Sequence, residues 1–327
     1  MKKNSHKQTL SESLIIEKYL KKLNFKKKES FNFENDGAYL NVAKDEKIIV
    51  SNDAIVEGVD FFTNDSADSI AHKIICYNLS DLSSMGASPY CFNLSLGLPK
   101  KINKKWIIIF SKKILKLQKK YNFFLLGGDI AQTKNIIISA TFFGKVSKGK
   151  IIKRNGAQIN DDIWVTGNLG NSFVGLMFKK NILKANNSIK KFFIEKYLYP
   201  SPCMIGNRLR SLANSAIDIS DGFYGDLEKL LHFKSLGANI DMESMPILLK
   251  LKKFIHQHRI NVNKLLSAGD DYEILFTSNP KKRYLINALS KKNKIKITKV
   301  GTIINKKGIY IDGKILNLNK RSFQYNF

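Results

Sequence analysis

Aspartates placed where apolar strands end or helices begin are the residues of this sequence best suited to chemistry. Eight follow that pattern: Asp36, Asp53, Asp81, Asp129, Asp218, Asp221, Asp270 and Asp271. A single aspartate at a turn is usually a helix cap, but several beside glycines need another explanation, because unpaired carboxylates are costly near a core. Mg²⁺ prefers such oxygen ligands and commonly takes one or two carboxylates together with substrate phosphates. The pattern therefore indicates several magnesium ions that neutralise a polyphosphate.

Glycine-rich segments are compatible with the same ligand. Gly127 and Gly128 would let the backbone approach a ligand closely. The segment "TGNLGNS", residues 166–172, would present N–H groups to an anion at a helix start, although an ordinary strand-to-helix turn explains it at least as well. Arg154 is a candidate phosphate ligand, or a solvated arginine, and Ser220 is a candidate helix cap.

Several common catalytic signatures are absent from the sequence. It has no P-loop, no protein-kinase motif set, no G-x-S-x-G and no H-E-x-x-H. None of the five histidines stands in a triad-like setting. No side-chain nucleophile for covalent catalysis is therefore evident.

The composition limits the class of protein. The chain has 327 residues, of which 43% are hydrophobic and 11% aromatic, which suits two globular domains with sizeable cores. No apolar run approaches the ~20 residues that a membrane span needs, and the N-terminus lacks the apolar region of a secretory signal. The three cysteines are far apart and odd in number, which argues against a disulfide framework. We therefore expect a cytoplasmic protein without a membrane partner.

The formal net charge of +28 raises the alternative of a nucleic-acid-binding protein. The lysines, however, form short clusters along the whole chain and are not gathered in one aromatic-studded groove or tail. This distribution favours a generally basic surface, which would also attract an anionic substrate, over a nucleic-acid partner. A basic nucleic-acid-binding protein stays the alternative from a different functional class.

Hydrophobic periodicity predicts mixed strands and helices in both halves of the chain. In the first half we expect a helix at 11–24, a hairpin at 38–53, a helix from 68 ending at Gly86, a strand at 90–99, a helix at 103–121, a strand at 122–129 ending in a glycine turn, and a strand at 135–146. After a connection at 147–156 we expect strands at 161–167, 297–304 and 308–314, a helix at 171–180, a strand, turn and helix within 216–233, and a turn into a strand within 265–278. The chain is thus predicted to be α/β (α+β), with domains 1–148 and 149–327.

Taken in order, the motifs closely resemble the thiamine-monophosphate kinase family. They are "SNDAIVEGV", "NLSDLSSMGASP", "LLGGD", "RNGA", "DIWVTGNLGNS", "AIDISDG" and "LSAGDDYE". The resemblance runs from about residue 12 to the C-terminus and places the chain in the superfamily of aminoimidazole ribonucleotide synthetase, selenophosphate synthetase and a hydrogenase-maturation protein.

The resemblance implies a fold and a reaction. The fold has an N-terminal α/β domain, whose strands join a homodimer interface, and a C-terminal α+β domain. The reaction transfers the γ-phosphoryl group of ATP directly to thiamine monophosphate, which gives thiamine diphosphate and ADP (EC 2.7.4.16). Such a transfer needs mainly alignment and charge neutralisation, which suits a site without a nucleophilic side chain.

The resemblance also assigns site residues, position by position. The magnesium positions are Asp36, Asp53, Asp81, Asp129, Asp218 and Asp221, with Ser51 and Asn52 completing the ligand shell. The positions that contact ATP are Gly128, Arg154 and Ser220, together with the nucleotide's metal ligand Asp129. The positions near thiamine monophosphate are Asp60, Asp270 and Phe323.

Three positions depart from the family pattern. Asn35 replaces the first aspartate of the G-D-D-[AC]-A motif, and Asn52 replaces a hydroxyl residue but is still able to coordinate through an amide or backbone oxygen. Asp60 stands where relatives carry histidine, so it either alters the contact with the substrate or is a loop residue facing water. Glu57, in the same acidic segment "IVSNDAIVEGVDFF", has no predicted role.

Other members of the superfamily are the nearest alternatives in function. Selenophosphate synthetase needs a reactive residue near the N-terminus, whereas the first cysteine here, Cys76, is expected inside a helix. The hydrogenase-maturation relative needs a cysteine in the C-terminal tail, and "RSFQYNF" has none. Both alternatives are therefore less favoured than the thiamine-monophosphate kinase reaction.

Overall fold

The computed structural model describes residues 10–317 and residue 322. The chain forms two compact units, each built from separate segments. The first comprises the chain up to Ala43 with Val50–Asn78 and Pro89–Phe143. The second comprises Lys44–Ile49, Leu79–Ser88 and the chain from Gly144 onward.

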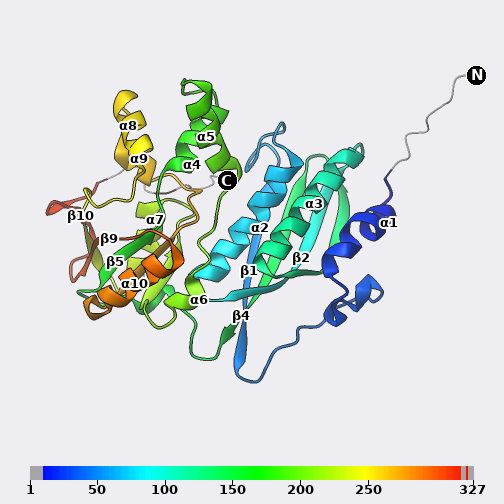
Figure 1. The fold of residues 1–327 in the computed structure, drawn as a ribbon, viewed down its shortest axis with the longest axis horizontal. Coiled ribbons are helices and arrows are strands. Elements are labelled where there is room, and N and C mark those ends of the chain that lie inside the picture. Colours follow the sequence, from blue (N-terminus) through cyan, green and yellow to red (C-terminus); the bar gives the residue numbers. More distant parts are fainter. Residues whose placement is uncertain (1–9, 318–321, 323–327) are drawn as a thin grey trace, which may run out of the picture. The chain divides into compact units, whose positions relative to one another are not determined.

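A four-stranded sheet, in the order β1-β4-β2-β3, carries the first set of predicted site residues. Its strands are β1 (Glu46–Val56), β2 (Ser88–Pro99), β3 (Phe124–Thr133) and β4 (Ile137–Ser147). Helices α2 (Ala67–Ser84) and α3 (Lys104–Tyr121) lie side by side against one face of this sheet (Figure 1). The apolar side of α3, at Ile107, Phe110, Ile114 and Leu117, is buried, which explains why its 3.6-residue periodicity predicted the helix correctly.

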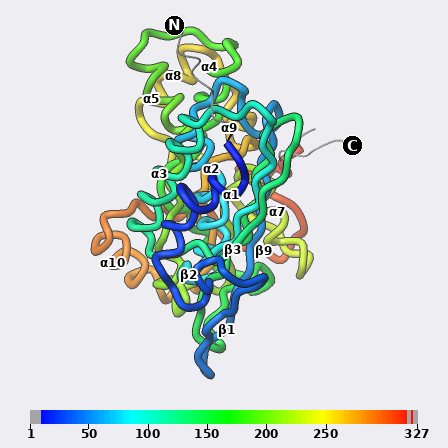
Figure 2. Tube along the Cα trace, turned by 90° about the vertical axis from the view of Figure 1, so that its right-hand side faces the viewer, coloured from blue at the N-terminus to red at the C-terminus, as the bar shows by residue number. Residues whose placement is uncertain are grey.

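The helix expected at 11–24 is present but irregular. It consists of α1 (Glu12–Ile15), a π-helical turn (Ile16–Leu20) and a 3₁₀ turn (Lys21–Asn24), and it ends where Phe25 adopts a left-handed conformation. Ser11 caps the first turn by accepting a hydrogen bond from the Leu14 N–H at 3.2 Å. A second 3₁₀ segment (Lys28–Phe33) follows. These turns pack on α3 and β3, where Figure 2 shows them as the blue trace.

The predicted hairpin at 38–53 is wrong in its first half. Residues 38–43 form no strand, and β1 has β4 as its neighbour in the sheet. The backbone of this segment is bonded elsewhere, because the Tyr39 N–H donates to the Glu29 carbonyl (3.1 Å) and the Asn41 N–H donates to the Tyr90 hydroxyl (3.3 Å). The sequence pattern predicted β1 itself but carried no information about which segment would pair with it.

The predicted glycine turn at the end of strand 122–129 is also wrong, because β3 continues through Gly127 and Gly128 to Thr133. β3 pairs in parallel with β2 along this length, with Gly128 beside Leu94. A Cβ atom at Gly128 would lie 2.0 Å from the Leu94 carbonyl oxygen. The close approach of the two strands therefore requires glycine here, whatever else Gly128 contacts.

The second unit is built on a seven-stranded sheet in the order β11-β10-β7-β9-β5-β8-β6. All recorded pairs are antiparallel except β10 with β7. The strands are β5 (Asp162–Thr166), β6 (Ser215–Asp218), β7 (Gly237–Ile240), β8 (Ile274–Ser278), β9 (Ile297–Ile304), β10 (Gly308–Ile311) and β11 (Lys314–Ile315). The strands expected at 161–167, 297–304 and 308–314 and within 216–233 and 265–278 are confirmed.

Helices cover both faces of this sheet. They are α4 (Asn171–Lys179), α5 (Asn187–Leu198), α6 (Gly206–Leu209), α7 (Phe223–His232), α8 (Leu249–Gln257), α9 (Val262–Leu266) and α10 (Arg283–Asn293). Alternate residues of β5 enter different cores: Ile163 and Val165 pack with α4, α5, α7 and α8, whereas Trp164 packs with Ile286 of α10. None of the described helices combines the length and apolar character needed to span a membrane.

Candidate active site

Strand β1 presents the predicted residues Ser51, Asn52 and Asp53 on alternating faces of its sheet. Ser51 and Asp53 share one face because side chains alternate along a strand. On that face the Ser51 hydroxyl donates to Oδ1 of Asn78 in α2 at 3.2 Å. The buried Asn78 side chain in turn donates to the Ile74 carbonyl (3.0 Å), so the helix fixes the side chain beside the strand.

Asn52 points to the other face and holds β1 to β4. Its Nδ2 donates to the Thr141 hydroxyl at 2.7 Å, and to the Ser139 hydroxyl and the Ala140 carbonyl at 3.3 Å. The amide group is therefore engaged in joining two strands.

Two further predicted ligands of the first unit are exposed. Asp129 lies on β3 beside Ser95 of β2, and Asp36 lies in the segment between the second 3₁₀ turn and β1. Within residues 10–317 and 322, no three side chains of His, Cys, Asp or Glu converge closely enough to hold a metal ion by themselves. Any magnesium at these carboxylates would thus need further oxygen ligands, from water, hydroxyl or backbone groups or a bound ligand.

The loop after β1 explains the two acidic residues whose roles were open. The Asp60 carboxylate accepts the Val56 N–H at 2.8 Å, which closes the loop. Glu57 binds Ile136, the residue directly before β4, through two hydrogen bonds of 2.9 Å. Its carboxylate accepts the Ile136 N–H, and its own N–H donates to the Ile136 carbonyl. The Asp60 carbonyl also accepts a bond from the buried Lys73 (3.4 Å). Both acidic side chains therefore shape this loop.

A buried carboxylate cluster forms in the second unit around Asp218, at the end of β6. Burial raises the pKa of Asp218 well above its ordinary value, and repulsion from Asp81 and Asp226 raises it further. The Ser80 hydroxyl and the charge of Arg154 oppose that shift. The sequence predicted Asp81, Asp218 and Arg154 as site residues, and the charges of Asp81 and Arg154 both act on the Asp218 carboxyl group.

Asp226 and Lys229 of α7 support the predicted residues Ser220 and Asp221, and sequence reasoning missed them. The fully buried Asp226 carboxylate accepts the N–H groups of Ser220 (3.1 Å) and Asp221 (3.0 Å). Lys229 donates to Asp226 at 2.8 Å and to Asp221 at 2.5 Å. The i, i+3 spacing of Asp226 and Lys229 was the signal that could have identified this pair.

The segment "AGDDYE" supplies a hydrogen-bonding carboxyl group to the start of α4. Both oxygens of Asp271 accept the N–H of Gly170, the residue that caps α4, at 2.9 Å. A carboxylate is favoured there by the partial positive charge of a helix N-terminus. Of the two interpretations of "TGNLGNS", the structure supports a strand-to-helix turn whose N–H group at Gly170 is already bonded within the protein. Burial raises the pKa of the Asp271 carboxyl well above its ordinary value, and the bond from Gly170 opposes this shift.

Glu273 joins the same turn through Thr166. The Thr166 hydroxyl donates to Glu273 at 2.6 Å and accepts the Ile274 N–H at 2.8 Å. Burial raises the pKa of Glu273 to about 7, although the bonds from Thr166 and the Asn168 N–H and the charge of Lys196 oppose the shift.

Asp270, predicted near the thiamine moiety, lies against the predicted ATP residue Ser220. Its N–H donates to the Ser220 carbonyl at 2.9 Å, and its carboxylate accepts the Tyr272 hydroxyl at 2.9 Å. Asp270 has a left-handed backbone (φ 70°). Phe323, the third residue predicted to contact the substrate, lies outside the described residues.

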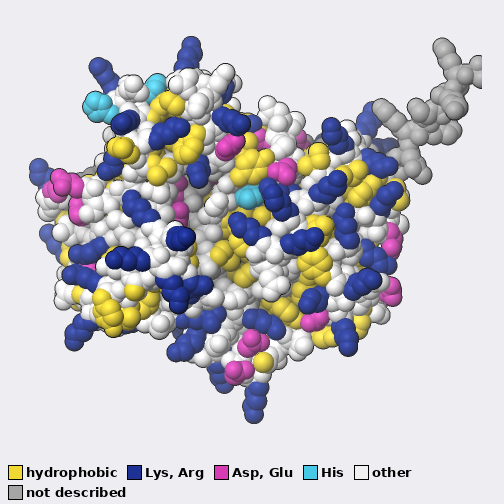
Figure 3. Space-filling view, in the orientation of Figure 1, with side chains coloured by type: hydrophobic (Ala, Val, Ile, Leu, Met, Phe, Trp, Pro, Cys, Tyr) yellow, Lys and Arg dark blue, Asp and Glu magenta, His cyan; other side chains and the backbone are white. Residues whose placement is uncertain are grey.

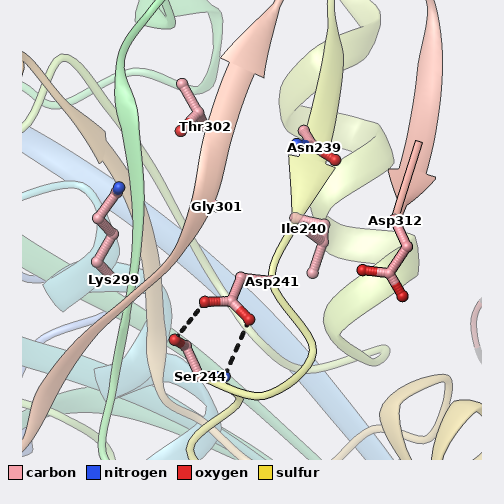
Figure 4. A pocket seen from close by; sticks show the side chains of 8 residues that line it. All are labelled: Asn239, Ile240, Asp241, Ser244, Lys299, Gly301, Thr302 and Asp312. Carbon is pink, nitrogen blue, oxygen red and sulfur yellow. Dashed lines mark hydrogen bonds between the residues drawn. The ribbon is translucent and has the colours of Figure 1, made fainter.

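A separate pocket lies beside the middle of β9 and the end of β7 and contains none of the predicted site residues (Figure 4). It encloses about 410 Å³, and Asp241, Asp312 and Lys299 are its charged lining residues. The Ser244 hydroxyl and the N–H groups of Ser244 and Glu243 bind Asp241 and lower its pKa. Lys299 lies 3.5 Å from Asp162. Because Asp241 and Lys299 already have partners within the protein, we do not favour this pocket as the active site.

Basic side chains do not gather in one stripe on the face drawn in Figure 3. Lysine and arginine side chains are spread across it and are interrupted by apolar and acidic groups. The distribution seen from the sequence thus holds on this surface, and it does not outline a groove of the kind that follows a nucleic-acid backbone.

Comparisons with known proteins identify both halves of the chain. The profile of "AIR synthase related protein, N-terminal domain" matches residues 34–146, and that of the corresponding C-terminal domain matches residues 158–314. A curated thiamine-monophosphate kinase of Buchnera aphidicola subsp. Acyrthosiphon pisum is 37% identical over 293 residues, which cover 88% of this chain and 90% of the relative.

Solved structures agree with this assignment. The thiamine-monophosphate kinase of Stenotrophomonas maltophilia K279a is 30% identical, with a TM-score of 0.81 over 86% of this chain and 90% of that one. The structure described as AaThiL complexed with AMPPCP and TMP superposes with a TM-score of 0.78 over 88% of this chain and 90% of that one; at 24% identity it supports the fold. The predicted α/β (α+β) two-domain fold is confirmed. This chain therefore belongs to the thiamine-monophosphate kinase family of the AIR synthase related proteins.

Proposed function

We propose that this protein is a thiamine-monophosphate kinase, which transfers the γ-phosphoryl group of ATP to thiamine monophosphate and releases ADP and thiamine diphosphate (EC 2.7.4.16). The observation that carries the proposal is the 37% identity to a curated kinase of that name across 88% of the chain. A relative of the same fold was solved in complex with AMPPCP and TMP. AMPPCP is an analogue of ATP, and TMP abbreviates thiamine monophosphate.

The carboxylates fit the magnesium that such a reaction uses. We assign Asp36, Asp53 and Asp129 of the first unit, and Asp81, Asp218 and Asp221 of the second, as its ligands, with oxygens of Ser51 and Asn52. The mutual repulsion recorded at Asp218 is what a bound cation would relieve. Since no three of these side chains converge by themselves, water and, once ATP is bound, phosphate oxygens would complete each site, as is usual for Mg²⁺. Bound Mg²⁺ would neutralise the phosphates and align them for transfer.

The remaining assignments concern the nucleotide and the acceptor. Arg154 and Ser220 contact the ATP phosphates, and Gly128 lies beside the metal ligand Asp129 on β3. Asp270 lies near the positively charged ring of thiamine monophosphate. Its hydrogen bond to Ser220 connects the residue assigned to the acceptor with a residue assigned to ATP. Phe323 packs on the acceptor. Transfer is direct, as the family resemblance implies, because alignment and charge neutralisation suffice for phosphoryl transfer.

We also propose that the protein is a cytoplasmic homodimer. Val50 on β1 and Ile137 on β4 are 57% and 38% exposed, and both belong to the first unit. We take this sheet as the association surface because the family resemblance implies that its strands join a dimer interface. The cysteines Cys76, Cys91 and Cys203 are free and buried, which suits a reducing compartment.

Turnover with defined substrates tests the proposed function. Purified protein is incubated with ATP, Mg²⁺ and thiamine monophosphate, and ADP and thiamine diphosphate are measured together. We expect equal amounts of both products, and neither product when the metal is chelated. Thiamine offered in place of its monophosphate is the control acceptor. The absence of thiamine diphosphate across a full range of Mg²⁺ concentrations would contradict the proposal.

A further inference from the structure

The turn that carries Ser220 and Asp221 is held by a side chain from the helix that follows it. One oxygen of Asp226 accepts both N–H groups of the turn, and its other oxygen accepts Lys229. Asp226 has no exposed surface, so its position is fixed by the core of the second unit. It therefore acts as a positioning residue for Asp221.

Lys229 connects this support to the proposed metal ligand. Its ammonium group bridges Asp226 (2.8 Å) and Asp221 (2.5 Å). The side chains of Lys229 and Asp221 are 40% and 37% exposed, whereas that of Asp226 is fully buried. Lys229 thus supplies a positive charge at the carboxylate that we assign to Mg²⁺.

We propose that Lys229 is a built-in counter-ion of Asp221, which neutralises this carboxylate in the metal-free protein and competes with Mg²⁺ for it. The inference rests on the proposed function, because it takes Asp221 as a metal ligand. When Mg²⁺ binds, the ammonium group leaves Asp221 and keeps its bond to Asp226. The turn consequently stays in place in both states, since Asp226 holds it by two backbone N–H groups that do not depend on Lys229.

Competition between Lys229 and Mg²⁺ predicts a change in Mg²⁺ affinity that is opposite in sign to the change expected for a lysine with a purely structural role. Removing the charge of Lys229 should strengthen Mg²⁺ binding, because the metal no longer displaces a cation. A lysine needed only to support the turn would have the opposite effect, since its loss would disorder Asp221. For a partly exposed ion pair the gain in apparent Mg²⁺ affinity should be about fivefold at most.

A metal titration without substrates tests the inference. Thermal unfolding midpoints of the wild type and of Lys229→Gln, Lys229→Met and Lys229→Arg are measured in chelator and then in rising Mg²⁺. We expect the two neutral variants to reach half of the metal-induced shift at three- to fivefold lower Mg²⁺, and Lys229→Arg to behave as the wild type. Lys292→Met removes an exposed lysine of α10 as the control.

The outcomes separate this inference from the proposed function. Unchanged or weaker Mg²⁺ binding in both neutral variants would overturn the competition, as would the absence of any metal-induced shift in all proteins. The titration contains neither ATP nor thiamine monophosphate, so its result does not depend on turnover. A protein that makes thiamine diphosphate normally, but binds Mg²⁺ equally well with and without Lys229, refutes only the role of Lys229.

Discussion

Asp53 and Asp129 are the single residues whose replacement tests the magnesium assignment most directly. They lie on β1 and β3, and we assign both to magnesium. Replacing either by alanine should lower turnover roughly a hundredfold or more, because charge stabilisation in phosphoryl transfer depends on each correctly placed group. Steady-state assays of Asp53→Ala and Asp129→Ala measure this loss. Asp312→Ala, at an exposed aspartate outside the proposed site, is the matched control, and near-normal activity in both site variants would refute the assignment.

Asp60 allows the loop and substrate roles to be separated. Its carboxylate accepts the Val56 N–H, so Asp60→Ala should destabilise the protein by about 1 kcal/mol, while Asp60→Asn retains an acceptor and should cost less. Denaturant unfolding measures both. Asp60→His restores the residue usual in relatives, and a changed KM for thiamine monophosphate would indicate that this position contacts the substrate. Equal stability of Asp60→Ala and the wild type would argue against the loop role.

Glu273 predicts a pH dependence of stability. Its pKa in the folded protein is raised to about 7 from 4.5, so the folded state binds more protons than the unfolded state between these values. The free energy of unfolding should therefore fall as pH rises from about 4.5 through 7, by up to about 3 kcal/mol. Glu273→Gln should make this decline shallower, whereas Glu195→Gln, at an exposed helical position, should leave it unchanged. Parallel pH profiles for the wild type and Glu273→Gln would contradict the prediction.

At the scale of elements, β2 and β3 offer a comparison between adjacent glycines. A Cβ at Gly128 would meet the Leu94 carbonyl oxygen at 2.0 Å, whereas one at Gly127 would meet nothing nearer than Asn93 Oδ1 at 3.5 Å. Gly128→Ala should therefore destabilise the protein by about 1–3 kcal/mol, since the strands must separate. Gly127→Ala should be nearly neutral. Denaturant unfolding of both variants decides this, and equal stabilities would show that β3 shifts without cost.

The sequence predicted helices and strands well where a periodic apolar face packs on a core. It predicted them poorly where the structure depends on which distant segment the backbone bonds to. The buried stripe of α3 and the apolar run Ile163–Val165 made these elements recognisable. Nothing in residues 38–43 showed that their N–H groups would bond to Glu29 and Tyr90 instead of a neighbouring strand.

The same distinction applies to the candidate site. Motif order gave Asp218, Ser220 and Asp221, because these residues stand in a recognisable pattern. Asp226, which positions the turn, and Lys229 offered only their i, i+3 spacing as a local signal, and their bonds to the turn became evident in the structure. Long-range pairs such as Asp271 with Gly170 depend on tertiary structure and have no local signal.

At the scale of the whole molecule, the exposed face of the first unit's sheet predicts association. Val50→Asp places a charge among apolar side chains and should convert a dimer into a monomer, because an unpaired charge is costly in an interface. Size-exclusion chromatography with light scattering measures the mass. Leu249→Asp, at a 69% exposed position of α8, should leave the mass unchanged. A wild type that is monomeric at high concentration would contradict the prediction.

The interleaving of the two units determines how the chain can be divided. Residues 44–49 and 79–88 belong to the second unit although both precede position 148. A fragment expressed from residue 149 onward would therefore lack two of its own segments, including Asp81 and the Ser83 hydroxyl that binds the Cys203 carbonyl at 2.6 Å. A gene cut at that point would encode the first unit completely but would divide the second, so co-expression of both halves would be needed to recover activity.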